Sequence, residues 1–287
     1  MKILFFVVVM ALFITSLNSG SNGNCYYIAN DTEAVLVDAG ISCRETENRM
    51  RLLGLSMSKV KAIFISHEHT DHIKGVESIA EKYTLPVYIT TATAQRGRLH
   101  FKKELINYFA AYEEVSIGNL IVTAFPKLHD AVDPHSFIIT GNGITVGVFT
   151  DIGANCEHVT KHFCQCHAAF LEANYDDEML EQGRYPIFLK NRIRGGEGHL
   201  SNKQALEIFI NHRPAFMTHL LLAHLSKDNN DPQKVHQLFS EYARGVEIAV
   251  ASRYEQTALY TIQSAATRLP TKRHRKALVQ NRQLSLF

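Results

Sequence analysis

The sequence predicts an α/β fold, because short apolar runs that suit buried strands alternate with segments whose apolar residues recur at helical spacing. Strands are predicted at residues 62–65, 87–89 and 146–149, and helices at 45–53, 72–81 and 202–211. The chain has 287 residues, 46% of them hydrophobic, and can therefore bury a large core in one domain. We expect a single catalytic domain over residues 1–265.

The overall charge is nearly balanced. The net charge is +2 and the sequence pI is about 8.2. A domain that binds nucleic acid mainly through a large basic surface would carry a stronger excess of Lys and Arg. Composition alone therefore does not indicate a nucleic-acid-binding protein.

The N-terminus admits two interpretations. Met1 and Lys2 precede an apolar stretch over residues 3–14, which has the basic start and apolar centre of a secretory signal. No clear small-x-small cleavage site follows, and Met10 is an alternative start. We interpret the chain from Ala11 onward as the first strand, followed by a Gly/Ser/Asn turn. We therefore expect a cytoplasmic protein with no membrane association.

Cysteine usage supports the same compartment. The five cysteines are an odd number and show no disulfide pattern of a small secreted scaffold. They are Cys25, Cys43, Cys156, Cys164 and Cys166, and we interpret them as structural thiols.

The most informative motif is the run from His67 to His72, which follows the predicted strand at 62–65 and has the sequence His-Glu-His-Thr-Asp-His. A turn after a strand can direct His67 and His69 at one metal ion, and Asp71 and His72 at a neighbouring one. A lone pair of histidines would carry little weight. The complete run predicts a dinuclear site for Zn²⁺ or Mn²⁺.

Four further predicted strands also end in residues that commonly bind metals. Each could instead be a polar residue that simply ends a strand, because turns favour such residues. Together with the histidine run, they favour a metal site. They are Asp38, His129, Asp151 and His224.

These residues resemble the signature of the metallo-β-lactamase superfamily. The resemblance implies an αββα sandwich, in which two β-sheets are flanked by helices and a dinuclear metal site lies at one edge. It implies that Asp151 bridges both ions and that Asp38 orients the metal loop by hydrogen bonding. The implied metal ligands are His67, His69, Asp71, His72, His129, Asp151 and His224, with His135 as the alternative to His129.

The resemblance also implies a hydrolytic reaction. Two divalent ions lower the pKa of a bridging water, so that a metal-bound hydroxide is the nucleophile. Glu172 and His199 match a pair that, in the phosphodiesterase branch, passes a proton to the leaving oxygen. This branch includes the tRNA 3′-processing nucleases. The alternative is that Glu172 is only a carboxylate at the end of a strand and His199 only a turn residue before a helix. The implied catalytic residues are Asp71, Glu172 and His199.

Over residues 11–262 the order of motifs closely resembles the bacterial WalJ/YycJ-type branch, whose members are regarded as DNA exonucleases linked to repair or cell-wall regulation. The resemblance implies DNA as the substrate. An RNA nuclease, a thioester or lactam hydrolase and a non-catalytic binding protein remain alternatives. Candidate substrate contacts are Ser21, Asn22, Lys190, Arg192 and Arg194, although the last three equally suit a solvated basic face.

The C-terminal segment, residues 266–287, is polar and basic and is expected to be a flexible tail. It ends in Gln-Leu-Ser-Leu-Phe, which resembles the pentapeptide by which bacterial DNA polymerases and repair proteins bind the sliding clamp. Leu284, Leu286 and Phe287 would form the apolar anchor, and Gln283 would occupy a polar pocket. A chance match is the alternative.

Overall fold

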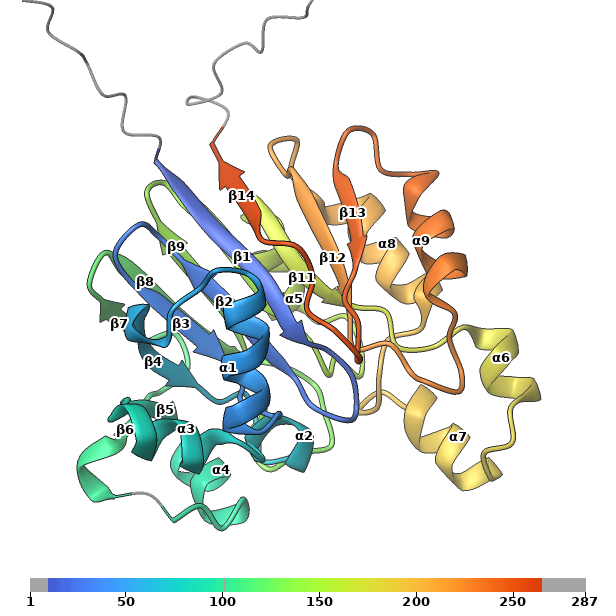
Figure 1. Ribbon diagram of the computed structural model, residues 1–287. Coiled ribbons are helices and arrows are strands. Elements are labelled where there is room, and N and C mark those ends of the chain that lie inside the picture. Colours follow the sequence, from blue (N-terminus) through green and yellow to red (C-terminus); the bar gives the residue numbers. More distant parts are fainter. Residues whose placement is uncertain (1–9, 101, 265–287) are drawn as a thin grey trace, which may run out of the picture.

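The computed structural model describes residues 10–100 and 102–264. Two seven-stranded β-sheets are stacked face to face, and helices cover the outer face of each sheet (Figure 1). This is the αββα sandwich that the family resemblance implies. The basic tail and its Gln283–Phe287 peptide lie outside the described residues.

The first sheet has the strand order β14-β1-β2-β3-β4-β5-β6. Its first four strands are antiparallel neighbours, and β3 to β6 run parallel. The strands are β1 (Ala11–Asn18), β2 (Cys25–Ala29), β3 (Ala34–Val37), β4 (Val60–Phe64), β5 (Val87–Ile89), β6 (Ile106–Tyr108) and β14 (Tyr260–Gln263). The predicted strand at Ala11 is confirmed as β1, which lies between β2 and β14.

The second sheet has the strand order β13-β12-β11-β10-β9-β8-β7. Here β10 to β13 run parallel, and β7 to β10 are antiparallel neighbours. The strands are β7 (Glu114–Ile117), β8 (Leu120–Pro126), β9 (His135–Gly141), β10 (Ile144–Phe149), β11 (Ala168–Glu172), β12 (His219–Ala223) and β13 (Glu247–Val250).

The helices connect the strands, and several cover the sheets. They are α1 (Cys43–Leu52), α2 (Thr70–Ile73), α3 (Val76–Tyr83), α4 (Thr91–Arg96), α5 (Glu157–Phe163), α6 (Asp177–Gln182), α7 (Ile187–Arg194), α8 (Asn202–His212) and α9 (Pro232–Ser240), with 3₁₀ turns at Met57–Lys59 and Lys103–Leu105. No helix in the described part of the chain is long and apolar enough to cross a membrane.

Three apolar layers hold the sandwich together. The central layer lies between the sheets and includes Phe64 and Phe170. One outer layer packs the second sheet against α5, α8 and α9, for example through Phe209. The other packs the first sheet against α1 and α3. Strands buried on both faces explain the unbroken apolar runs in the sequence.

The predicted helix over residues 72–81 is two helices, α2 and α3, with Gly75 between them. The Gly75 amide donates to the carbonyl of Ala39 at 2.7 Å, and a side chain at Gly75 would collide with the carbonyl of Ile41. The close approach of this loop ends one helix and begins the next. That contact is tertiary, so helical periodicity does not reveal it.

Candidate metal centre

The first group of metal-binding side chains consists of His67, His69 and His129. Nδ1 of His69 lies 3.1 Å from Nε2 of His67 and 3.3 Å from Nε2 of His129. The motif after β4 supplies the first two imidazoles, and the loop after β8 supplies the third. Three ring nitrogens therefore converge on one point, as ligands of a single ion would.

The backs of two of these rings are held by neighbours. Nδ1 of His129 donates to the carbonyl of Gly198 at 3.1 Å, and Nδ1 of His67 lies 2.9 Å from Oγ of Ser66. These contacts leave the Nε2 atoms directed at the shared point. Metal-binding histidines usually have such a partner on the other ring nitrogen.

The second group consists of Asp71, His72 and His224. Oδ2 of Asp71 lies 3.4 Å from Nε2 of His224 and 3.5 Å from Nε2 of His72. Asp151 lies between the two groups. Its Oδ2 is 3.2 Å from Nε2 of His72, and its Oδ1 is 3.8 Å from Nε2 of His129. This position suits a carboxylate shared by two ions.

Two buried carboxylates support the second group from behind. Asp38 accepts from the amide and hydroxyl of Ser66, and its Oδ2 lies 2.7 Å from Nδ1 of His72. Oε1 of Glu172 lies 2.9 Å from Nδ1 of His224. Each carboxylate thereby directs the Nε2 atom of its histidine toward the site.

Glu172 lies close enough to the cluster to be considered a ligand itself, but its oxygens are already used. Oε1 lies close to Nδ1 of both His199 and His224, at 2.8 and 2.9 Å. Oε2 accepts from the amides of Ile152 at 2.8 Å and Leu200 at 3.2 Å. Its position therefore suits orienting histidines better than binding an ion.

The two groups differ in their electrostatics. Burial lowers the pKa of His67 well below its usual range and lowers that of His129 to about 4, which keeps both rings neutral as metal ligands must be. Burial opposes the charge on His72, yet the surrounding carboxylates, Asp151 foremost, raise its pKa well above the usual range. Burial likewise opposes the charge on His224. The charge of Asp151, with hydrogen bonds from His224 to Asp71 and Glu172, nevertheless raises the pKa of His224 to about 10.

The donor set fits divalent ions. The second group, with the shared Asp151, attracts positive charge through its carboxylates. The first group offers neutral histidine nitrogens. Oδ2 of Asp151 is buried and lies 3.2 Å from Nε2 of His72, but it forms no well-aligned hydrogen bond among the described residues. A buried carboxylate oxygen without a donor is costly unless a cation compensates it. His/Asp ligation of this kind suits Zn²⁺ or Mn²⁺.

Three strand ends at the site have strained backbones. Asp38, Asp151 and His224 follow β3, β10 and β12, with φ angles of 60°, 55° and 55°. Left-handed conformations cost non-glycine residues about 1–2 kcal/mol each. Such strain persists only where surrounding contacts enforce it, and it is concentrated at functional sites.

His199 lies beside the second group. Its Nδ1 is 2.8 Å from Oε1 of Glu172, and its side chain is 21% exposed while that of Glu172 is fully buried. The segment before α8 places it there, and α8 begins with a capping box formed by Ser201 and Gln204. The pair predicted from the sequence is therefore brought together, with one imidazole edge open to solvent.

Other predicted residues lie elsewhere. His135 belongs to neither group, and its Nδ1 donates to the carbonyl of Asp133 at 3.0 Å. Ser21 and Asn22 are exposed in the loop between β1 and β2, where Asn22 donates to the carbonyl of Arg253.

The three basic residues of α7 are paired with protein groups. Lys190 is largely buried and donates to the carbonyl of Glu181, and Arg194 pairs with the Glu181 carboxylate. Arg192 pairs with Asp130 at 2.5 Å. Their predicted phosphate contacts would compete with these interactions.

Sequence reasoning missed several residues around the centre. Asn24 Nδ2 lies 3.2 Å from Oδ2 of Asp71 and 3.1 Å from Nε2 of His72. Lys127 is buried and donates to the carbonyl of Thr150 at 2.7 Å. The Ser19 hydroxyl accepts from the amide of His224 at 2.7 Å. Asn24 ends the early Gly/Ser/Asn loop, the only sequence signal that pointed to it.

Comparison with known proteins identifies the family. A model of the beta-lactamase superfamily domain matches residues 33–224, which is more than half of the chain. The chain belongs to the beta-lactamase superfamily.

Relatives of known sequence support this assignment. Exodeoxyribonuclease YycJ of Bacillus anthracis is 32% identical over 268 residues, covering 92% of this chain and 98% of that protein. Exodeoxyribonuclease WalJ of Streptococcus pneumoniae is 31% identical over 227 residues, covering 77% and 84%. The superfamily member described here is a hydrolase.

The fold agrees with that of a solved superfamily structure. YhfI from Bacillus subtilis, a metallo-β-lactamase fold protein, superposes with a TM-score of 0.67 at 16% sequence identity, covering 88% of this chain and 99% of that one. At this identity the likeness supports the fold alone.

Proposed function

We propose that this hydrolase cleaves phosphodiester bonds of DNA from a strand end and uses two divalent ions. The ligands would be His67, His69 and His129 for one ion and Asp71, His72 and His224 for the other, with Asp151 shared. Zn²⁺ or Mn²⁺ would lower the pKa of a coordinated water and neutralise charge on the phosphate. The relatives named as exodeoxyribonucleases support DNA as the substrate.

The observation that carries the proposal is the contact between Glu172 and His199. A general acid must reach the leaving oxygen while a partner holds it in position. Nδ1 of His199 is held by Glu172 at 2.8 Å, so Nε2 is left to face the partly open site. An alkoxide leaving group such as a DNA sugar oxygen needs a proton, which makes this arrangement useful for phosphodiesters.

The remaining side chains would position the reaction. Glu172 contacts both His199 and His224, and it would thus couple the proton donor to the second ligand group. Asp38 would fix the ring of His72. Lys127, beneath the site, would offset part of the buried negative charge without touching substrate.

We also propose that the enzyme acts in the cytoplasm, with residues 1–265 as the hydrolase domain and 266–287 as a tail. The peptide from Gln283 to Phe287 would bind the sliding clamp and raise the local concentration of enzyme at replicating DNA. The motif alone supports this part of the proposal.

The experiment compares leaving groups. Loss of a general acid should matter for DNA, whose leaving alkoxide is basic, and much less for bis(p-nitrophenyl) phosphate, whose leaving phenolate is stable without a proton. We expect His199→Ala to lower kcat on DNA by about 10²–10⁴-fold and to affect the activated ester far less. Asp71→Ala should abolish both activities, while Asp31→Ala, in the distant turn between β2 and β3, should change neither.

Equal loss of both activities in His199→Ala would contradict the proton-donor role. RNA and a thioester complete the substrate panel. Turnover of the thioester, with DNA and RNA left intact, would replace the nuclease proposal by a small-molecule hydrolase. Cleavage of RNA alone would change the substrate class.

A further inference from the structure

A pocket of about 330 Å³ lies directly beside the second ligand group. One wall includes Ser19, whose hydroxyl accepts from the amide of His224. Another includes Leu225 and Ser226, which follow His224 in the chain. The pocket therefore adjoins the backbone of His224, and the metal ligands themselves lie outside its lining.

The pocket lining combines apolar and charged residues. Leu225, Pro232 and Val250 contribute apolar surface, and Lys227 and Arg253 contribute positive charge beside the carboxylate of Glu255. Apolar surface next to cations suits a molecule with a heterocyclic base and an anionic phosphate. The size is at the lower end for ligand pockets, which suits one small unit such as a nucleotide.

Tyr254 also lines the pocket, and its side chain is 71% exposed. Buried packing does not account for this residue, because most of its surface faces solvent. Exposed aromatic rings beside basic residues are the usual stacking platforms for unpaired bases. Its backbone is fixed, since the carbonyl of Tyr254 accepts from the Arg49 guanidinium at 3.1 Å.

The adjoining loop between β1 and β2 fixes the position of Arg253. Asn22 donates to the Arg253 carbonyl at 2.9 Å and accepts from its guanidinium at 3.4 Å. A Cβ at Gly20 would lie 3.3 Å from the Arg253 side chain, and Gly20 has a φ of 143°. The loop that the sequence predicted to contact substrate would thus act by holding a basic residue in place.

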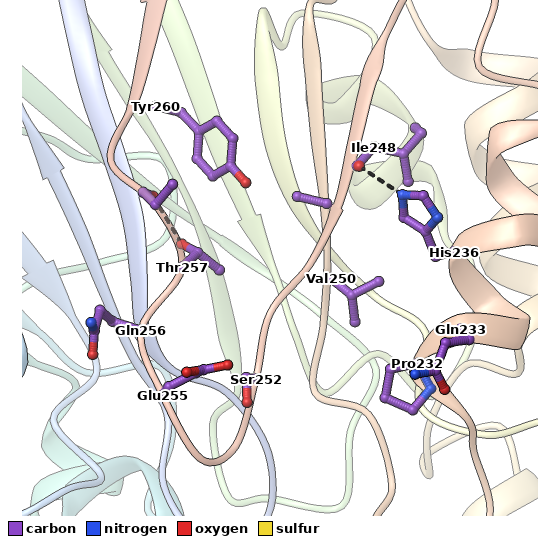
Figure 2. A pocket seen from close by; sticks show the side chains of 12 residues that line it. Pro232, Gln233, His236, Ile248, Val250, Ser252, Glu255, Gln256, Thr257 and Tyr260 are labelled. Atoms are coloured by element: carbon purple, nitrogen blue, oxygen red, sulfur yellow. Dashed lines mark hydrogen bonds between the residues drawn. The ribbon is translucent and has the colours of Figure 1, made fainter.

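A second cavity of about 550 Å³ shares Pro232, Val250, Ser252 and Glu255 with this pocket. Figure 2 shows this cavity between α9 and the chain that joins β13 to β14, with Glu255 and Ser252 on the joining loop. Among the described residues that line it, none is Lys or Arg. Glu255 at the junction would repel phosphates, so a nucleic-acid strand should end in the first pocket.

We propose that the pocket beside His224 binds the terminal nucleotide of the substrate strand, with the base against Tyr254 and the phosphate near Lys227 and Arg253. This inference rests on the proposed nuclease function. It adds a reason for cleavage from an end, because the pocket has room for about one nucleotide and the Glu255 carboxylate lies where the pocket joins the second cavity.

The test pairs a change in the protein with a change in the DNA. One set of single-stranded oligonucleotides has a normal terminal nucleotide, and the other has an abasic residue at the 5′ or the 3′ end. Stacking on an aromatic side chain is worth about 1–3 kcal/mol per base, so Tyr254→Ala should lower kcat/KM on normal DNA by about tenfold. The abasic residue at the correct end should lower wild-type kcat/KM by a similar factor.

If the ring and the base contact each other, the two losses will not add. Tyr254→Ala should therefore cleave normal and abasic DNA at nearly equal rates, and Tyr254→Phe should behave like the wild type. Equal effects of Tyr254→Ala on normal DNA and on DNA with either abasic end, or no effect at all, would overturn the inference. The control is Tyr108→Ala, which removes a similarly exposed ring from β6 at the far edge of the first sheet.

The basic residues of the pocket have their own matched pair of variants. Lys227→Ala should raise KM for DNA and weaken its dependence on salt, whereas Lys61→Ala, on exposed β4 surface, should do neither. Unchanged KM and salt dependence in Lys227→Ala would remove the basic residues from the proposal. A wild-type protein that leaves every DNA intact would refute the nuclease function itself, whereas wild-type cleavage insensitive to the Tyr254 changes would refute only the pocket.

Discussion

Each imidazole of the second ligand group is held by a buried carboxylate on its Nδ1 side. Asp38 directs His72, and Glu172 directs His224. The sequence indicated both acids, because each follows or ends an apolar strand. It did not indicate that Glu172 also contacts His224, since residues 52 positions apart meet only through the sheet.

The assignment of His129, and not His135, as a metal ligand can be tested with single substitutions. The ring of His129 lies with His67 and His69, whereas His135 bonds to the carbonyl of Asp133. We expect His129→Ala to lose about one bound metal ion per chain and His135→Asn to retain the wild-type content. Elemental analysis of the purified variants measures this. Loss of metal in His135→Asn alone would reverse the assignment.

The cysteines give a prediction that depends on pH. Thiolates are the reactive form, so a raised pKa slows alkylation. Burial, with a contribution from Glu47, raises the pKa of Cys43 to about 11. Burial, with a smaller contribution from Cys164, also raises the pKa of Cys166, whereas Cys164 itself is exposed.

At pH 8 we expect iodoacetamide to modify Cys164 before Cys43 or Cys166. Cys43 should react when the pH is raised toward 11, and Cys166 should react only after the protein is unfolded. Peptide mass mapping follows the order. Early modification of Cys166 in the folded protein would show that the packing beneath α5 is wrong.

At the level of elements, strands were easier to predict than loops. The prediction at 87–89 coincides with β5 because a short apolar run covered on both faces has sharp limits. Contacts between loops could not be predicted. The amide of Asn24 donates to the carbonyl of Asp71 at 2.7 Å, which joins the first loop of the chain to the metal motif.

A substitution at Gly40 tests how this loop packs against the metal motif. A Cβ at Gly40 would collide with the backbone of Asp71. We expect Gly40→Ala to destabilise the fold by about 1–3 kcal/mol and to weaken metal binding, because the metal loop must move. Thermal unfolding and chelator competition measure the two effects. Gly196→Ala, where a Cβ would meet nothing within 4 Å, is the control; wild-type behaviour of Gly40→Ala would contradict the packing.

At the level of the whole molecule, the sandwich brings the ends of strands from both sheets to one edge. Asp38 and His67 follow strands of the first sheet, and Asp151 and His224 follow strands of the second. The sequence predicted this convergence only through resemblance to a family, since periodicity identifies strands but not how sheets face each other.

The tail gives a prediction for the whole chain. Removal of residues 283–287 should abolish binding to a bacterial sliding clamp and leave hydrolysis of free DNA unchanged, because the peptide is separate from the metal centre in the sequence. Surface plasmon resonance with immobilised clamp measures binding. Equal binding with and without the peptide would reduce the motif to coincidence.

The proposed function requires the chain to hydrolyse DNA from an end with metal ions held by this cluster. The most direct measurement is the time course of cleavage of end-labelled double- and single-stranded DNA by purified protein carrying Mn²⁺ or Zn²⁺. We expect progressive release of short products from one end, abolished by chelation and restored by the metal. Intact DNA after incubation with protein shown to hold two ions would contradict it.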